Sequence, residues 1–168
     1  MKKLSLILLL INLLTPTFSQ VTSYLVPNGL VAWWSFTGNA NDESGNNNNG
    51  TVINATLTTD RFGNQNSAYY FNGSDAKISI SAQPNLNLRN SVSVSAWINP
   101  ERMGGQIVFR GDSQSAKDPY FLHIRDSSVY FQKYVGSGFT ACYAKFDTTL
   151  LIPNVYNHVV GTFDSSSS

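Results

Sequence analysis

Alternation of apolar and polar residues recurs along most of this chain and constrains its fold more than any other feature. It is clearest in residues 92–98, where four apolar residues alternate with three others: Val92, Val94, Ala96 and Ile98 with Ser93, Ser95 and Trp97. A period of two places successive side chains on opposite faces of a β-strand. Beyond residue 19 no stretch sustains the period of an amphipathic helix. The pattern therefore predicts an all-β protein.

Further segments with strand-like composition are separated by turn-forming residues. The expected strands are residues 30–36, 67–71, 76–81, 92–98, 106–110, 120–125, 129–135, 139–146 and 158–163. Asp126-Ser127-Ser128 predicts a hairpin between two of them, and the polar residues 39–50 predict a long loop. Eight or nine short strands, roughly ten residues apart, predict a two-sheet antiparallel β-sandwich, or jelly roll.

The N-terminus has the layout of an export signal. Met1-Lys2-Lys3 is positively charged, residues 4–14 are mostly apolar, and small residues precede the end of the segment at Ser19. This order is typical of a secretory signal peptide over residues 1–19, cleaved after Ser19. The alternative is a membrane anchor, but the apolar run is about half as long as a bilayer span requires. We expect a secreted or cell-surface protein with no membrane span after cleavage.

Cleavage would leave a linker, residues 20–28, and a single domain, residues 29–168. Loss of Lys2 and Lys3 takes the 11 basic residues to 9, against 10 acidic residues. Charged residues make up only 12% of the chain, and Asn, Ser and Thr supply most of the polar surface. This balance gives no electrostatic reason to expect nucleic acid or anionic lipid as a partner. It suits neutral polar partners such as sugars or other proteins.

The single cysteine, Cys142, allows no disulfide within the domain, so the core must supply its stability. Its place in an expected strand favours a buried, unpaired side chain. A disulfide with sequence beyond Ser168 is the alternative.

Five segments follow one another in a characteristic order: Gly29–Phe36, Ala40–Asn46 with Gly50, Ala68–Asp75, Ser91–Ile98 and Asn157–Asp164. Together they resemble the laminin G-like (LamG) domains of the concanavalin A-like lectin/glucanase superfamily, and more narrowly the LamG-type jelly rolls of bacterial surface proteins. The resemblance implies strands beyond the last segment that the printed sequence lacks. We therefore expect an incomplete sandwich whose C-terminal strands are missing, with further domains in the full-length chain.

Some relatives of this fold are glycosidases, which need two carboxylates about 5–10 Å apart. Glucanases of the fold place both acids at alternate positions of one strand. Here the only glutamates, Glu43 and Glu101, lie in expected loops, and no expected strand carries two acids at alternate positions. His158 matches a family position that packs near the core, and His123 is expected on a surface or in a cleft. We expect no enzymatic activity.

The resemblance also implies a candidate calcium site, because LamG-like domains often hold one Ca²⁺ on the rim of the sandwich. Calcium binds six to eight oxygens from carboxylates, amides and carbonyls. The candidate metal ligands are Asp42 and Asn48 in the polar loop, with Asp75 after the Asn72-Gly73 turn. The alternative is that Asp42 organises a turn and Asp75 caps a hairpin.

Aromatic rings stack on the C–H faces of sugars, so exposed aromatic residues are candidates for ligand contact. Trp33, Trp34 and Trp97 lie in segments that match the family, where large rings usually fill the core. Three tyrosines on later strands are the candidate ligand-binding residues: Tyr130, Tyr134 and Tyr143. They predict contact with a polysaccharide or glycoprotein.

These observations predict a secreted, non-catalytic binding or adhesion module of a longer surface protein, with a carbohydrate or glycoconjugate as ligand. The first alternative is a structural spacer or protein–protein interaction domain. The second is an accessory domain of a carbohydrate-active enzyme.

Overall fold

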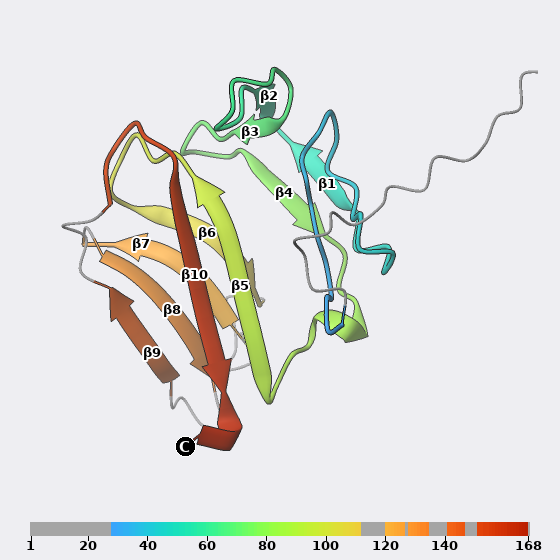
Figure 1. The fold of residues 1–168 in the computed structure, drawn as a ribbon, viewed down its shortest axis with the longest axis vertical. Helices are drawn as coiled ribbons and strands as arrows, with labels where there is room; N and C mark the ends of the chain where they lie inside the picture. The colour runs from blue at the N-terminus through green and yellow to red at the C-terminus, as the bar shows by residue number, and fades with distance from the viewer. Residues whose placement is uncertain (1–27, 112–119, 127, 135–140, 147–150, 168) are drawn as a thin grey trace, which may run out of the picture.

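A computed structural model describes residues 28–111, 120–126, 128–134, 141–146 and 151–167 (Figure 1). These residues form short β-strands and two 3-10 helices in the following order: β1 Gly50–Ile53, β2 Thr56–Thr58, β3 Ala68–Tyr70, β4 Lys77–Ile80, η1 Pro84–Leu86, β5 Ser91–Ile98, β6 Gly105–Arg110, β7 Tyr120–Arg125, β8 Ser128–Tyr134, β9 Ala141–Phe146, β10 Asn157–Asp164 and η3 Ser165–Ser167. No helix in this part of the chain is long and apolar enough to cross a membrane.

Two antiparallel layers make up the main body. Strands β6, β7, β8 and β9 form a four-stranded sheet in that order, and β5 pairs with β10 along the whole length of both strands. In Figure 1 the β5–β10 ladder lies in front of the four-stranded sheet. The β1–β4 and β2–β3 ladders complete the described strands. The predicted all-β sandwich is confirmed.

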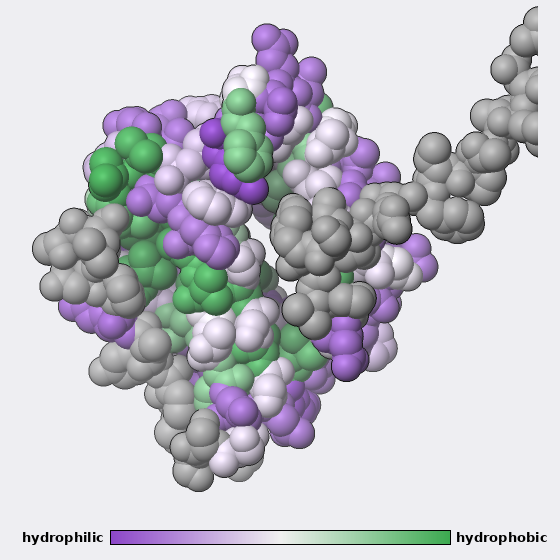
Figure 2. Space-filling view, viewed as in Figure 1, coloured by the Kyte–Doolittle hydropathy of each residue, from purple (hydrophilic) through white to green (hydrophobic). Residues whose placement is uncertain are grey.

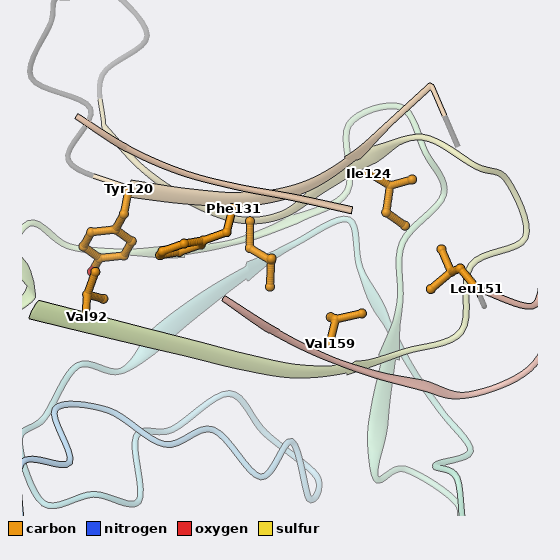
Figure 3. Close-up of a cluster of buried hydrophobic side chains, with 7 residues drawn as sticks. Val92, Tyr120, Ile124, Phe131, Leu151 and Val159 are labelled. Carbon is orange, nitrogen blue, oxygen red and sulfur yellow. The ribbon is translucent and has the colours of Figure 1, made fainter. Parts of the chain in front are cut away.

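The core lies between these two layers (Figure 3). Its buried residues are Val92, Tyr120, Leu122, Ile124, Phe131, Leu151 and Val159. Alternation explains which side chains face inward: on β7, Tyr120, Leu122 and Ile124 are buried, and the residues between them are only half-buried. Removing apolar side chains from water stabilises such a sandwich by about 25 cal/mol per Å².

The strand expected at residues 30–36 was wrong, because the structure contains no strand there. Side chains of the following loop bind the backbone of this segment instead. Asn46 Nδ2 and Asn48 Nδ2 donate hydrogen bonds to the carbonyl of Val31, at 3.0 and 2.9 Å. The amide of Glu43 donates to the carbonyl of Trp33 at 2.8 Å. Because the loop occupies the carbonyls of Val31 and Trp33, these groups are not paired with a neighbouring strand.

The remaining strand predictions are confirmed with small shifts at their ends, and β7 and β8 form the expected hairpin. Alternation missed β1 and β2, which are too short to show a period. The expected signal peptide and linker lie outside the described residues, so those boundaries stay predictions. Cys142 lies in β9 opposite Lys133, and its side chain is likewise outside the described part.

Candidate functional site

Trp97 lies on the outer face of the β5–β10 ladder and is 47% exposed. Its position follows from strand alternation, since Val92, Val94, Ala96 and Ile98 occupy the inner face. His158 lies directly opposite on β10, and the two rings stack with centroids 4.8 Å apart and an interplanar angle of 20°. Ser95 Oγ lies 2.7 Å from His158 Nε2 and fixes that ring. The indole is thus held in place while half of it faces solvent.

A turn after β2 brings a second set of side chains to Trp97. The guanidinium carbon of Arg61 lies 4.2 Å from the ring centroid of Phe62 and 4.5 Å from that of Trp97. Such cation–π contacts are typically worth about 0.5–1 kcal/mol at exposed sites. Phe62 is 72% exposed. Arg61 therefore connects the turn to the outer face of β5.

Asp60 organises this turn. Its Oδ1 accepts hydrogen bonds from the amides of Phe62 and Asn64 at 2.8 and 2.9 Å, and its Oδ2 accepts one from Asn64 Nδ2 at 3.0 Å. Desolvation raises the pKa of the Asp60 carboxyl, but these hydrogen bonds and the nearby Arg61 outweigh it and hold the pKa below its usual value. The turn that presents Arg61 and Phe62 is therefore internally bonded.

These residues line an open pocket of about 640 Å³. Its lining residues are Arg61, Phe62, Trp97, Asn99, Asn154, Val155 and Tyr156. We call it the Trp97 pocket. Tyr156 Oη donates a hydrogen bond to the carbonyl of Thr59 at 2.7 Å, which joins the segment before β10 to the β2–β3 turn. Figure 2 shows the molecule from the side of the β5–β10 ladder, as in Figure 1, with green apolar residues interspersed among white and purple ones.

The predicted ligand-binding tyrosines lie on the other sheet. Tyr130 and Tyr134 alternate with the buried Phe131 and Lys133, so they occupy the outer face of β8 and are half-buried. Aromatic contacts extend from both of them: Tyr130 packs against His123 with centroids 5.3 Å apart, and Tyr134 against Phe121 at 6.3 Å. We call these residues the β7–β8 aromatic face.

Tyr143 lies opposite Gln132 in the register of β9, and its side chain is outside the described part. His123 is half-buried, as expected of a cleft or surface position. Burial and the charge of Arg125 lower the pKa of its imidazole, although a hydrogen bond with the side chain of Gln132 opposes them. His123 Nε2 is buried without a hydrogen-bond partner in the described residues.

Asp42 binds the backbone of its own loop. Its Oδ1 accepts from the amides of Trp33 and Ser44 at 3.0 and 2.9 Å, and its Oδ2 accepts from the amide of Asn48 at 2.9 Å. Burial raises the pKa of this carboxyl, but the hydrogen bonds outweigh burial and hold the pKa below its usual value. The turn-organising role that the sequence left open accounts for these contacts.

Asn48 is 1% exposed, and only one end of its side-chain amide forms a hydrogen bond within the described residues. Its Nδ2 donates to Val31, but its Oδ1 is buried without a partner among the described residues. An unpaired buried carbonyl oxygen is costly, and a cation or a water molecule would satisfy it. Asn48 Oδ1 therefore is the atom of this loop that best fits a metal ligand.

Asp75 belongs to a different cluster. Its two oxygens accept hydrogen bonds from Asn54 Nδ2 and Asn72 Nδ2, both at 2.7 Å. Asn54 follows the last residue of β1, whereas the Asp42 loop is bonded to Asn49, just before the first. The structure thus places Asp75 and Asp42 at opposite ends of β1. Among the described residues, no three His, Cys, Asp or Glu side chains gather as a metal-binding group.

Sequence reasoning missed the Trp97 pocket. It assigned Trp97 and His158 to structural positions near the core, and both assignments were wrong, because the two side chains are exposed on the outer face. The signal was present in the alternation, which places Trp97 on the face of Ser93 and Ser95. Nothing in the sequence shows that Arg61 and Phe62 reach this face, because that contact depends on the tertiary fold.

A family model of laminin G type, described as the concanavalin A-like lectin/glucanases superfamily, matches residues 72–168, which is more than half of the chain. Searches of curated proteins and of solved structures found no match. The matched range includes Trp97, His158 and Tyr156, whereas Arg61 and Phe62 precede it. The Trp97 pocket is therefore formed partly by the matched region and partly by the turn before it.

Proposed function

The chain belongs to the concanavalin A-like lectin/glucanases superfamily, whose laminin G-type domains are binding modules, and we propose that it is a non-catalytic module that binds carbohydrate outside the cell. Its membership of this family supports binding in general. The choice of carbohydrate rests on the Trp97 pocket. Export rests on the signal-peptide layout of residues 1–19.

The observation that carries the proposal is the exposure of Trp97 inside a pocket. A tryptophan that is 47% exposed keeps apolar surface in water, whereas the inner face of the same strand is well packed. Sites for small ligands are concave and combine apolar or aromatic walls with a few polar groups. The side-chain amides of Asn99 and Asn154 supply such groups, since neither has a hydrogen-bond partner in the described residues.

The same arrangement suits a sugar ring. A pyranose presents C–H groups on one face and hydroxyl groups around its edge. Arg61 covers part of both rings, but the ring of Phe62 is 72% exposed and, with the exposed part of Trp97, offers apolar surface for the C–H face. The amides of Asn99 and Asn154 can donate to and accept from hydroxyls. The stack of Trp97 on His158 and the hydrogen bond between Ser95 and His158 hold the site in one conformation before binding, which lowers the entropic cost of association.

A second candidate function is protein–protein contact, which the sequence also left open. Exposed apolar side chains near the pocket favour it: Ile152, Val155 and Val160 are 55%, 48% and 53% exposed. A large exposed apolar patch often marks a protein interface. Here the exposed Asn154 lies between Ile152 and Val155, and the exposed His158 precedes Val160, so the surface is mixed rather than continuous.

Calcium remains a prediction from the family. Its ligands at the rim would be Asn48 Oδ1 and the Asp42 carboxylate, in the loop that also fixes Val31 and Trp33. A bound ion would supply positive charge to the unpaired oxygen of Asn48 and stabilise the loop. Asp75 would not contribute, because it lies at the far end of β1.

Binding to an array of neutral and acidic glycans tests the function. We expect the wild-type protein to bind at least one class of oligosaccharide, and Trp97→Ala to lose most of that affinity. Tyr134→Ala is the matched control, since it removes an aromatic ring from the outer face of the other sheet. Loss of binding in Tyr134→Ala alone would move the site to the β7–β8 aromatic face. Absence of glycan binding by a folded wild-type protein would contradict the proposal.

A further inference from the structure

We propose that the Trp97 pocket selects acidic saccharides, and that the Arg61 guanidinium binds the carboxylate of a uronic acid residue. The inference rests on the proposed function, because it names the ligand class of the same pocket. It is argued from Arg61, a charged side chain in the pocket that forms no ion pair within the described residues.

Arg61 is a cation without an anionic partner. The salt bridge within the described part of the chain joins Arg125 to Asp126, and Arg61 makes neither a salt bridge nor a hydrogen bond there. Its planar group instead lies against Phe62 and Trp97. A guanidinium stacked on rings keeps its N–H edges available, and those edges match the two oxygens of a carboxylate.

The surroundings of Arg61 compensate this charge only in part, because the Asp60 carboxylate interacts with it electrostatically but forms no ion pair. None of the pocket-lining residues is acidic. The nearest carboxylate in sequence is Asp60, but its oxygens accept three hydrogen bonds from Phe62 and Asn64. Asp60 lowers the local potential without forming an ion pair with Arg61. A ligand carboxylate would therefore meet a positive group with free donors.

The other groups of the pocket favour a sugar over other anions. A phosphate group or an aspartate-rich peptide carries more than one negative charge, whereas the lining contains a single cation, which matches the single charge of a uronic acid. By contrast, the lining offers the apolar ring surface that Arg61 leaves exposed, chiefly on Phe62, which is 72% exposed, and unpaired amides from Asn99 and Asn154. A uronic acid uses all three kinds of contact at once, because it has a C–H face, hydroxyl groups and one carboxylate.

The test compares each uronic acid with its methyl ester, which keeps the sugar ring and removes the negative charge. Trisaccharides of galacturonic, glucuronic and mannuronic acid, and their methyl esters, are titrated into the full-length protein by calorimetry. We expect at least one acid to bind about tenfold or more tightly than its ester, since a charge-assisted hydrogen bond adds this much. The preference should weaken with added salt, because the site is open to solvent.

Variants test whether Arg61 causes the preference for the acid over its ester. In Arg61→Gln we expect acid and ester to bind equally, whereas Arg61→Lys should restore part of the preference. Arg125→Gln is the matched control, because it removes an exposed arginine from the other sheet and should leave the preference unchanged. Thermal unfolding of each variant verifies that it is folded.

The outcomes separate this inference from the proposed function. Equal binding of acid and ester by the wild type would overturn the selectivity and leave carbohydrate binding intact. Binding of an aspartate-rich peptide as tight as that of the acidic trisaccharides would overturn it too. If the wild type binds neutral glycans of the array but no uronate, the inference fails alone. If it binds no saccharide at all, the proposed function fails with it.

Discussion

Gly161 of β10 lies against the ring of Phe131 of β8, so closely that a Cβ atom on Gly161 would come within 2.3 Å of the ring carbon Cγ. The two residues belong to opposite layers of the sandwich, and both are buried. A side chain at residue 161 would push the layers apart, because packed interiors lack room for an added methyl group. The glycine therefore sets how closely β10 and β8 approach.

Gly161→Ala should destabilise the protein by about 1–3 kcal/mol, the usual cost of overpacking a core. Chemical denaturation measures the change in the free energy of unfolding. Gly104→Ala is the matched control, since no atom lies within 4 Å of the Cβ it would add. A loss of stability in Gly104→Ala as large as in Gly161→Ala would show that close packing against Phe131 is not the cause.

Asp42→Asn should destabilise the protein by about 1–2 kcal/mol at neutral pH, because an amide replaces a carboxylate that accepts three backbone N–H groups. The pKa of Asp42 is lowered from 3.8 in the folded protein, so its stabilising effect is complete above that value. The effect disappears as the pH falls through the lowered pKa. The difference between wild type and variant should therefore shrink in acid, and denaturation at several pH values measures it. A constant difference would contradict this account of the loop.

Calcium should raise the unfolding midpoint of the wild type relative to EDTA. At a free concentration ten times the dissociation constant, one site adds about 1.4 kcal/mol. Asp42→Asn should abolish the shift, whereas Asp75→Asn, the same change at the other end of β1, should preserve it. Loss of the shift in Asp75→Asn would instead make Asp75 a ligand. An unchanged unfolding midpoint at millimolar calcium would contradict calcium binding by this loop.

Lys133→Met should stabilise the protein by about 1 kcal/mol at neutral pH, since Lys133 has no anionic partner among the described residues and burying such a cation is unfavourable. Lys133 is 2% exposed, and its Nζ donates to the carbonyl of Tyr134 at 3.0 Å. Burial and the charge of Arg89 lower the pKa of its ammonium group. The advantage of methionine should shrink as the pH rises through this lowered pKa towards 10.5, because the buried lysine then loses its proton. Lower stability of the variant in urea denaturation would show that the Tyr134 hydrogen bond outweighs the cost of burial.

Strand alternation predicted the architecture because burial on one face of a sheet selects residues at a period of two. On β5 it sorted Val92 and Val94 from Ser93 and Ser95 correctly. It failed for residues 30–36, where composition favoured a strand but the carbonyl of Val31 is bound by loop side chains. Strand propensity describes which side chains suit a sheet, and it does not report whether a backbone partner is present.

The candidate site was less predictable than the fold. Alternation alone would have placed Trp97 outside, but the usual preference of large rings for the core led to the opposite assignment. Arg61 lies far from Trp97 in sequence, and its contact depends on the turn that Asp60 organises. Local patterns carry no information on such long-range contacts. Asp42 and Asp75 shared a suitable chemistry, yet the length of β1 separates them.

Resonances of the three tryptophan indoles in a ¹⁵N–¹H spectrum test carbohydrate binding at the Trp97 pocket most directly. The Trp34 indole donates to the carbonyl of Asn48 at 2.9 Å and serves as an internal control, and Trp97→Phe assigns the signal of interest. We predict that titration with the best glycan of the array shifts the Trp97 signal in a saturable way and leaves the Trp34 signal in place. An unchanged Trp97 signal at saturating glycan would contradict the account.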